Sequence, residues 1–385
     1  MRHYLSDRCV LKWLEEPSVY DIENDELYEV DDSAFAFLQG CASDEGCDGT
    51  QADSSFIDDC LSEGILTERR VAVRRPHLLK SPVPSLRYLE LQVTTKCNLR
   101  CRHCYIGKPS DRELPVDSLR RVLREFEEMQ GLRLLITGGE PLLHSSFQEF
   151  NDDLPFYAFR KVLFTNGLLL RKNLIRGLNV DEIQFSVDGM EHGHEALRGK
   201  GTYGKVMDRI GDTLSEGMSV SVATMVHQEN LEEFDRMDLL FRGMGIRDWT
   251  VDVPCVSGSF AENALLQVPP EIAGPYFSYG FGGGLHGGGK GYGCGLHLAS
   301  VLADGTVAKC AFYGDKPAGK VSGGLRAAWG RVRPVRLDEL ECARISCGAI
   351  DVCRGGCRFR AETSLGQGRR DPFKCAAYGQ QGCPE

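Results

Sequence analysis

The sequence predicts an α/β protein in three parts. These are a winged-helix-like α+β domain with a linker (residues 1–80), a partial TIM-like barrel of six strand–helix units (residues 81–255) and a cysteine-rich C-terminal domain (residues 256–385). Three observations predict this division. The net charge changes sign after residue 66, strand and helix patterns alternate from Tyr88 to about Asp252, and cysteines crowd the last 45 residues.

The first 66 residues are strongly acidic. They hold 17 acidic and 3 basic side chains, a net charge of −14 against −10 for the whole chain, so the other 319 residues carry +4. The basic, proline-containing stretch 69–84 follows this segment and is the predicted linker. The overall negative charge also argues against a nucleic-acid partner.

Local patterns predict the elements of this acidic segment. Apolar and β-branched residues on both sides of residues 23–26 predict a hairpin. Asp32 is expected to cap a helix over 33–38, and Ser54 or Ser55 to cap a second helix that ends at Gly64.

The middle of the chain alternates between strand and helix. Six units of this kind predict a parallel sheet curled into a partial barrel, with chemistry at the C-terminal ends of the strands. The predicted strands are 88–94, 133–137, 161–165, 182–187, 219–226 and 247–251, and the clearest helices are 116–129, 203–216 and 231–244.

Composition narrows the functional classes. No run approaches the roughly 20 apolar residues of a membrane helix, and the start of the chain lacks the apolar stretch of a signal peptide, so we expect a cytoplasmic protein with no membrane partner. Sixteen cysteines in a long, unsecreted chain indicate metal or cluster ligation more than disulfides.

A Cx3Cx2C loop follows the first barrel strand directly, with Cys97, Cys101 and Cys104. Three thiolates on one loop can hold three irons of a [4Fe–4S] cluster and leave the fourth iron open to another ligand. The alternatives are redox thiols or a zinc site, for which His103 is the candidate fourth ligand.

Three more polar motifs end the next three strands: Gly138-Gly139-Glu140, Thr165-Asn166-Gly167 and Ser186-Val187-Asp188. Each alone is commonly a turn or a helix cap. Their order behind the cysteine loop is what makes them specific.

With these motifs, residues 86–255 resemble the radical S-adenosylmethionine (SAM) superfamily. The resemblance implies that the three cysteines of the loop bind the cluster, whose open iron chelates SAM. It implies that Gly138, Gly139 and Glu140 contact the methionine ammonium, and that Arg198 pairs with the SAM carboxylate. The other implied SAM-binding residues are Tyr105 and Val226 at the adenine, Ser186 and Asp188 at the ribose and methionine end, and Thr165 with Asn166.

The C-terminal cysteines resemble the SPASM domain, which carries auxiliary iron–sulfur clusters. The family's Cx2C is replaced here by Cys342-x4-Cys347. The resemblance implies two clusters, one on Cys294, Cys310 and Cys357, and one on Cys342, Cys347, Cys353 and Cys375. Either Cys255 or Cys383 completes the first set, or its open iron takes solvent or a substrate thiolate. A structural zinc ribbon is the alternative.

The N-terminal unit resembles the RiPP recognition element, a small domain that binds the leader of a ribosomally made peptide. The alternative is a winged helix that merely packs on the barrel. Cys41, Cys47 and Cys60 in this unit are expected to be buried thiols.

Together these resemblances imply a radical SAM/SPASM maturase that modifies a ribosomally made precursor peptide. A reduced [4Fe–4S] cluster would cleave SAM to a 5′-deoxyadenosyl radical that abstracts hydrogen from the peptide, so that a thioether or carbon–carbon crosslink forms. An external one-electron donor such as flavodoxin or ferredoxin is required. Two alternatives remain: an enzyme of the same type acting on a small molecule such as a tetrapyrrole, and a non-catalytic iron–sulfur or peptide-binding protein.

Overall fold

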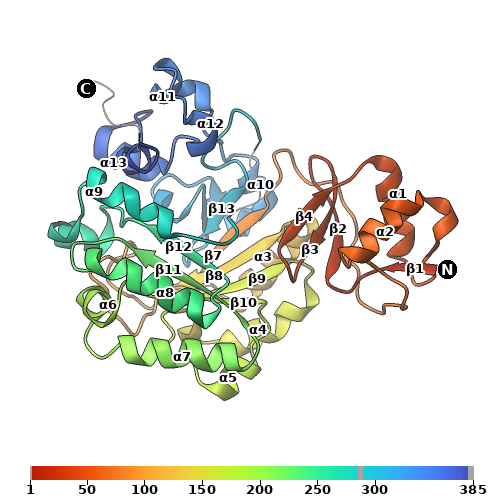
Figure 1. The fold of residues 1–385 in the computed structure, drawn as a ribbon, viewed down its shortest axis with the longest axis horizontal. Helices are drawn as coiled ribbons and strands as arrows, with labels where there is room; N and C mark the ends of the chain where they lie inside the picture. The colour runs from red at the N-terminus through yellow and green to blue at the C-terminus, as the bar shows by residue number, and fades with distance from the viewer. Residues whose placement is uncertain (1, 285–288, 380–385) are drawn as a thin grey trace.

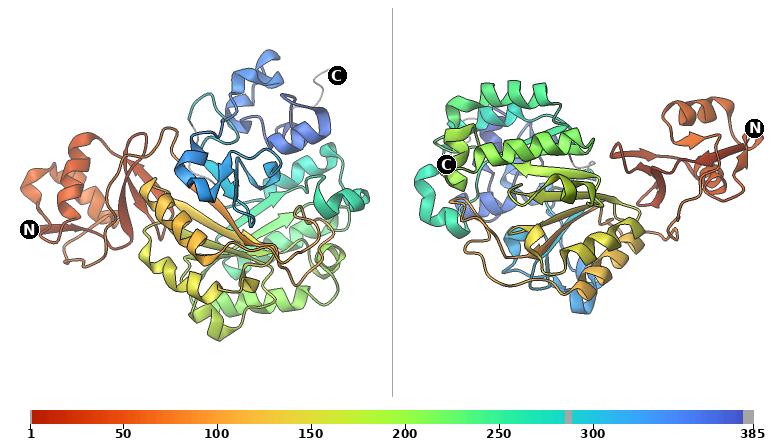
Figure 2. Two further views of the ribbon diagram at one scale, coloured as in Figure 1. Left: turned by 180° about the vertical axis from the view of Figure 1, so that it is seen from behind. Right: turned by 90° about the horizontal axis from the view of Figure 1, so that it is seen from below.

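The computed structural model describes residues 2–284 and 289–379. It shows a central sheet with helices around it and a small N-terminal lobe at one side (Figure 1). The same lobe stands apart from the rest in the two further views of Figure 2. Within the described residues, no helix combines the length and apolar character needed to cross a bilayer.

The lobe is the predicted α+β domain. Its elements are β1 (Arg2–Leu5), β2 (Cys9–Trp13), β3 (Pro17–Asp21), β4 (Glu26–Glu29), α1 (Asp32–Cys41), β5 (Cys47–Asp48), η1 (Gly49–Gln51), α2 (Ser54–Ser62) and β6 (Leu66–Thr67). The predicted hairpin is β3–β4, and the antiparallel sheet runs in the order β2-β3-β4. Cys41, Cys47 and Cys60 are buried in its apolar core, as expected.

The predicted helix caps are wrong by one residue. Asp31, with an extended backbone, caps α1 by accepting from the Ala34 N–H at 2.8 Å. Asp53 caps α2 by accepting from the Ser55 N–H at 2.8 Å. In each case an aspartate precedes the expected residue, and its carboxylate reaches the free N–H groups of the first turn.

Six parallel strands form the middle of the main sheet, in the order β12-β11-β10-β9-β8-β7. They are β7 (Tyr88–Thr94), β8 (Arg133–Gly138), β9 (Arg160–Thr165), β10 (Glu182–Ser186), β11 (Ser219–Met225) and β12 (Asp248–Asp252). The helical segments between them are α3 (Val116–Glu128), η2 (Pro141–Leu143), α4 (Phe147–Asp153), η3 (Leu154–Phe156), α5 (Lys172–Arg176), α6 (Glu191–Arg198), α7 (Tyr203–Ser215), η4 (Leu231–Glu233) and α8 (Phe234–Met244). Each predicted strand is found within one residue of its predicted bounds.

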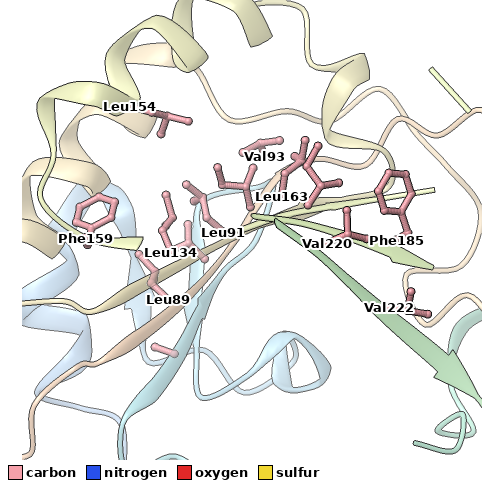
Figure 3. Close-up of a cluster of buried hydrophobic side chains, with 14 of the residues drawn as sticks. Leu89, Leu91, Val93, Leu134, Leu154, Phe159, Leu163, Phe185, Val220 and Val222 are labelled. Atoms are coloured by element: carbon pink, nitrogen blue, oxygen red, sulfur yellow. The ribbon is translucent and has the colours of Figure 1, made fainter. Parts of the chain in front are cut away.

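The two faces of this sheet differ. On one face, alternate strand residues such as Leu89, Leu91 and Val93 are fully buried against the helices (Figure 3). Burial of each such side chain stabilises the fold by about 1.5–3 kcal/mol. The intervening residues, such as Gln184 and Ser186, are only half-buried and line the inner face of the partial barrel.

The C-terminal part extends the same sheet. β13 (Leu298–Val301) pairs in parallel with β7, and β14 (Thr306–Ala308) and β15 (Gly319–Lys320) follow antiparallel. The sheet therefore runs across the predicted domain boundary at residue 255, and the boundaries themselves remain predictions. The remaining helical segments are η5 (Gly258–Leu266), α9 (Pro270–Ala273), η6 (Gly274–Tyr279), η7 (Ala311–Tyr313), η8 (Val321–Gly323), α10 (Leu325–Trp329), η9 (Leu337–Glu339), α11 (Glu341–Arg344), α12 (Ile350–Cys353), α13 (Arg358–Leu365) and α14 (Pro372–Ala377).

The N-terminal domain is docked on the N-terminal ends of the barrel strands. Lys12, 1% exposed, donates to Gly131 O at 2.7 Å and to Ala158 O at 2.9 Å. Arg160, the first residue of β9, donates to Ile22 O at 2.7 Å. This contact leaves the opposite end of the barrel, where the sequence motifs lie, free of the N-terminal domain.

Candidate functional site

The sequence motifs meet at the C-terminal end of the barrel. The cysteine loop follows β7, and the other three motifs end β8, β9 and β10, which are consecutive neighbours in the sheet. Because these strands are parallel, their last residues lie along one edge.

Cys97, Cys101 and Cys104 are half-buried free thiols on this loop. Burial and the nearby Cys104 and Cys97 thiols raise the pKa of Cys101 to about 11, although the charge of Arg198 opposes the shift. The Leu99 N–H donates to Cys97 Sγ at 3.4 Å, as backbone amides do for thiolate ligands. Three neighbouring thiols without a fourth protein ligand fit a [4Fe–4S] cluster with one open iron.

His103, the ligand proposed for a zinc site, has other contacts. Its Nε2 lies 3.6 Å from Asp188 Oδ2 and 3.3 Å from Arg198 Nη2. Among the described residues, no three His, Cys, Asp or Glu side chains converge on the position of a single metal ion.

Gly138 and Gly139 pack against the start of the cysteine loop. The Gly139 N–H donates to Thr94 O at 2.8 Å, and the Glu140 N–H donates to Lys96 O at 2.7 Å. A Cβ atom at Gly139 would lie 2.3 Å from Lys96 O. The close approach that requires glycine here is therefore to the backbone that leads into Cys97, whereas contact with the methionine ammonium stays a prediction.

Glu140 is fully buried beneath this backbone. It accepts hydrogen bonds from Thr165 Oγ1 at 2.8 Å and from the Asn166 N–H at 2.9 Å. Burial raises its pKa to about 7, although these hydrogen bonds oppose the shift. Asn166 Nδ2 in turn donates to Asn98 Oδ1 at 2.8 Å, a contact that sequence reasoning missed because no spacing signals it.

Asp188 and Arg198 form a buried ion pair at the end of β10. Arg198 Nε donates to Asp188 Oδ2 at 2.6 Å, and the Met225 N–H donates to Oδ1 at 2.8 Å. Burial acts to raise the pKa of Asp188, but the charge of Arg198 holds it well below its usual range. Both carboxylate oxygens already have protein partners, so a ribose contact by Asp188 stays a prediction.

The side chains of His103, His194 and His227 lie around Asp188. No pattern in the sequence indicates that they are its neighbours. His227 Nε2 lies 3.0 Å from Asp188 O, and His194 Nδ1 lies 3.3 Å from the Asp188 N–H. Burial lowers the pKa of His103 and of His194 to about 4, so both rings are neutral near pH 7. Neutral rings supply hydrogen bonds here without adding charge.

The remaining predicted SAM contacts have different surroundings. Tyr105 OH donates to the half-buried Glu90 at 3.2 Å, and its ring lies 4.9 Å from that of Phe312. Ser186 is half-buried on the inner face of the barrel. The Val226 side chain is fully buried in the main apolar core, so the predicted adenine contact would involve the strand edge at Val226, and this contact stays a prediction.

A groove of about 700 Å³ runs from the cysteine loop to the C-terminal part. Tyr105, next to Cys104, lines one wall, and Ala311 and Phe312, next to Cys310, line another. The Phe312 ring stacks on Phe359 with centroids 4.8 Å apart. The groove thus connects the surroundings of two cysteine groups.

The first C-terminal group contains Cys255, Cys294, Cys310 and Cys357. A hydrogen bond from Cys255 lowers the pKa of Cys357 to about 7. Burial raises the pKa of Cys310 to about 12, with further contributions from Cys294 and Cys357. Cys255 therefore lies with the three predicted ligands, while Cys383 falls outside the described residues.

The second group contains Cys342, Cys347, Cys353 and Cys375. Burial and the nearby Cys342 and Cys353 thiols together raise the pKa of Cys375 to about 12. Burial also raises the pKa of Cys342, and the nearby Cys347 makes a smaller contribution in the same direction. The described cysteines from position 255 onward thus lie in two groups that match the two predicted ligand sets, and cluster binding by these groups stays a prediction.

Comparison with known proteins agrees with this geometry. Residues 91–241 match the family model of the radical SAM superfamily. The chain is 27% identical over 318 residues to the mycofactocin maturase MftC of Mycolicibacterium smegmatis, which covers 70% of this chain and 77% of that protein. It is 26% identical over 208 residues to the AdoMet-dependent heme synthase of Oleidesulfovibrio alaskensis, 52% of this chain and 54% of that protein.

Solved structures also match over nearly the whole chain. SuiB of Streptococcus suis, determined in complex with its precursor peptide SuiA, superimposes with a TM-score of 0.71, covering 96% of this chain and 99% of SuiB at 15% identity. This likeness shows a shared fold. The predicted α/β radical SAM fold is confirmed. The match of residues 91–241 to the radical SAM superfamily identifies the enzyme type, whose cofactors are SAM and a [4Fe–4S] cluster.

Proposed function

We propose that this radical SAM enzyme modifies a ribosomally made peptide and that it forms a thioether or carbon–carbon crosslink in it. One observation carries the proposal: a groove of about 700 Å³ is lined both by Tyr105, next to Cys104, and by Ala311 and Phe312, next to Cys310. A peptide segment could lie in this groove with its side chains near both cysteine groups.

Cys97, Cys101 and Cys104 would hold the SAM cluster. When bound, the cluster supplies the electron that cleaves SAM, and the resulting 5′-deoxyadenosyl radical abstracts a hydrogen atom from the peptide. The protein orients these groups through the Gly139 and Glu140 backbone contacts to residues 94–96 and through the Asn166–Asn98 hydrogen bond. Buried Glu140 offers the carboxylate expected at the methionine ammonium.

The C-terminal cysteines would hold two auxiliary clusters of the SPASM type. Cys255 is the proposed fourth ligand of the first cluster, because its thiol hydrogen-bonds to Cys357. A cluster with four protein thiolates favours electron transfer from the substrate over direct binding of a substrate thiolate.

The N-terminal domain would bind the leader of the precursor peptide. Among the described strands, β4 is the edge of its sheet, with the Leu27 and Glu29 N–H groups turned away from β3 by the antiparallel register. Tyr28 OH on β4 lies 3.5 Å from Glu63, just after α2, so acidic side chains border this edge. An extended leader with basic residues suits the edge in hydrogen bonding and in charge.

The experiment uses the anaerobically reconstituted full chain and a short cysteine-rich peptide encoded beside the gene. Mass spectrometry should show a loss of hydrogen from the peptide that depends on SAM. Glu29→Pro removes an outward N–H from the β4 edge and should weaken peptide binding, while Glu29→Gln, which removes only the charge, should bind nearly as well at physiological salt.

The match to a heme synthase favours a tetrapyrrole as the second candidate substrate. Turnover of a tetrapyrrole without turnover of any neighbouring peptide would support that candidate and contradict the peptide proposal. Unchanged peptide binding by Glu29→Pro would reject the leader-binding edge alone.

A further inference from the structure

The Arg198 guanidinium is fixed beside the cysteine loop by a buried carboxylate. Its Nε donates to Asp188 Oδ2 at 2.6 Å, and Asp188 is itself held by the Met225 N–H. The side chains of Arg198 and Asp188 are 11% and 1% exposed. The ion pair therefore sets the direction of the two remaining guanidinium nitrogens.

Both of these nitrogens approach the cysteine loop. Nη1 donates to Cys101 Sγ at 3.9 Å, and Nη2 lies 3.3 Å from His103 Nε2. A guanidinium carries only donors, so the His103 Nε2 must accept this hydrogen bond. Because Nε2 then carries no proton, the ring proton is on Nδ1.

The His103 Nδ1–H is buried, and within residues 2–284 and 289–379 it has no hydrogen-bond partner. Native proteins rarely leave such a donor unpaired. The Arg198 guanidinium contacts both Cys101 Sγ and the His103 ring, so this ring lies beside the cysteine loop. The unpaired donor thus indicates an acceptor that the described residues do not supply.

We propose that Asp188, Arg198 and His103 form a chain of positioning residues that presents two hydrogen-bond donors to the [4Fe–4S] cluster or to the SAM carboxylate bound on it, and so raises the reduction potential of the cluster. The inference rests on the proposed placement of the cluster on Cys97, Cys101 and Cys104. One-electron reduction adds a negative charge to a site that already holds three thiolates. Donors aimed at sulfur stabilise the more negative state.

The test is a redox titration of the reconstituted full chain, followed by electron paramagnetic resonance, with and without SAM. The signal of the loop cluster is the one that disappears in Cys97→Ala. Arg198→Gln and His103→Phe should each shift its midpoint potential to more negative values. Arg198→Lys keeps the charge but loses the paired contacts, and should fall between Arg198→Gln and the wild type.

Arg102→Gln is the matched control. It removes the same charge from an exposed neighbour in the loop that donates to Asn263, so the midpoint potential should stay near that of the wild type. A shift in the absence of SAM identifies the cluster sulfurs as the acceptor. A shift seen only with SAM identifies the SAM carboxylate.

The proposal is overturned if Arg198→Gln and His103→Phe keep both the loop cluster and the wild-type midpoint potential under both conditions. It is also overturned if Arg102→Gln shifts the potential as far as they do. If the Arg198→Gln variant does not retain the loop cluster, the midpoint potential of the His103→Phe variant alone tests the proposal. A wrong assignment of the cluster to the loop cysteines would give a different result. In that case the Cys97→Ala variant would keep all the electron paramagnetic resonance signals of the wild type.

Discussion

The Asn166 side-chain amide donates to Asn98 Oδ1 at 2.8 Å and so joins the loop after β9 to the residue that follows Cys97. Asn166 is held in turn, because its N–H donates to the buried Glu140. The three motifs after β7, β8 and β9 are therefore one hydrogen-bonded unit. Its rigidity should determine how well the cysteine loop retains a cluster.

Asn98→Ala tests this unit. Loss of one partly buried hydrogen bond should lower the free energy of unfolding by about 1 kcal/mol. We expect a chelator to remove iron from the loop cluster several times faster than in the wild type. Asn173→Ala, at an exposed position on α5, is the control and should release iron at the wild-type rate. Equal rates for both variants would contradict a role for this contact.

Glu140 should make the stability of the cofactor-free chain depend on pH. Its folded-state pKa of about 7 lies above the ordinary value of 4.5, so the folded chain retains a proton that the unfolded chain has lost. The free energy of unfolding should fall as pH rises from about 4.5 to 7, by about 3 kcal/mol in total.

Glu140→Gln removes this titration and keeps the shape of the side chain. Its melting temperature should match that of the wild type near pH 5 and exceed it by a few degrees near pH 8. Glu128→Gln, exposed on α3, should show no such difference. A constant gap between Glu140→Gln and the wild type across this range would show that Glu140 does not titrate there.

Cys255 and Cys60 are both buried thiols, but only Cys255 lies with other cysteines of the C-terminal part. Cys255→Ala should therefore lower the iron content of the reconstituted chain by up to about four atoms, because the first auxiliary cluster loses a ligand. Cys60→Ala should keep the full iron content. Full iron content in both variants would remove Cys255 from the ligand set.

Replacing Cys347 and Cys353 together should destroy the second auxiliary cluster. The loop cluster lies on a separate segment, so formation of 5′-deoxyadenosine should continue while the modified peptide is lost. A double variant that still makes the modified peptide with its full iron content would show that this group holds no cluster. About one zinc per chain without a matching loss of iron would favour the zinc ribbon.

The sequence predicted the barrel well because its signals are local. Strands such as β10 carry apolar residues at every second position, here Ile183 and Phe185. In the structure these side chains face the helices, so the alternation in the sequence marks the strand correctly. By contrast, β1, β2 and β5 were missed. β1 has 4 residues and β5 has 2, and β2 begins with a continuous apolar run, Cys9-Val10-Leu11, without the alternation that marks a half-buried strand. The pairing of β13 with β7 joins residues about 210 apart, which no local pattern can indicate.

The sequence motifs predicted which residues lie at the site, but only some of the contacts that these residues make. Gly138 and Gly139 were expected at a ligand, and the structure shows their close approach to the backbone of residues 94–96. Asp188 was expected at the ribose and methionine end of SAM; the structure pairs it with Arg198, and the SAM contact stays a prediction. The glycine contacts join segments that are adjacent in the sheet but far apart in sequence, which no local pattern can indicate.

The iron content and SAM cleavage of a chain with Cys97, Cys101 and Cys104 all changed to alanine test the central claim most directly. We expect a loss of about four irons relative to the wild type, with the C-terminal clusters retained, and no 5′-deoxyadenosine. Formation of 5′-deoxyadenosine by the triple variant at the wild-type rate would contradict the assignment of the radical SAM cluster to this loop.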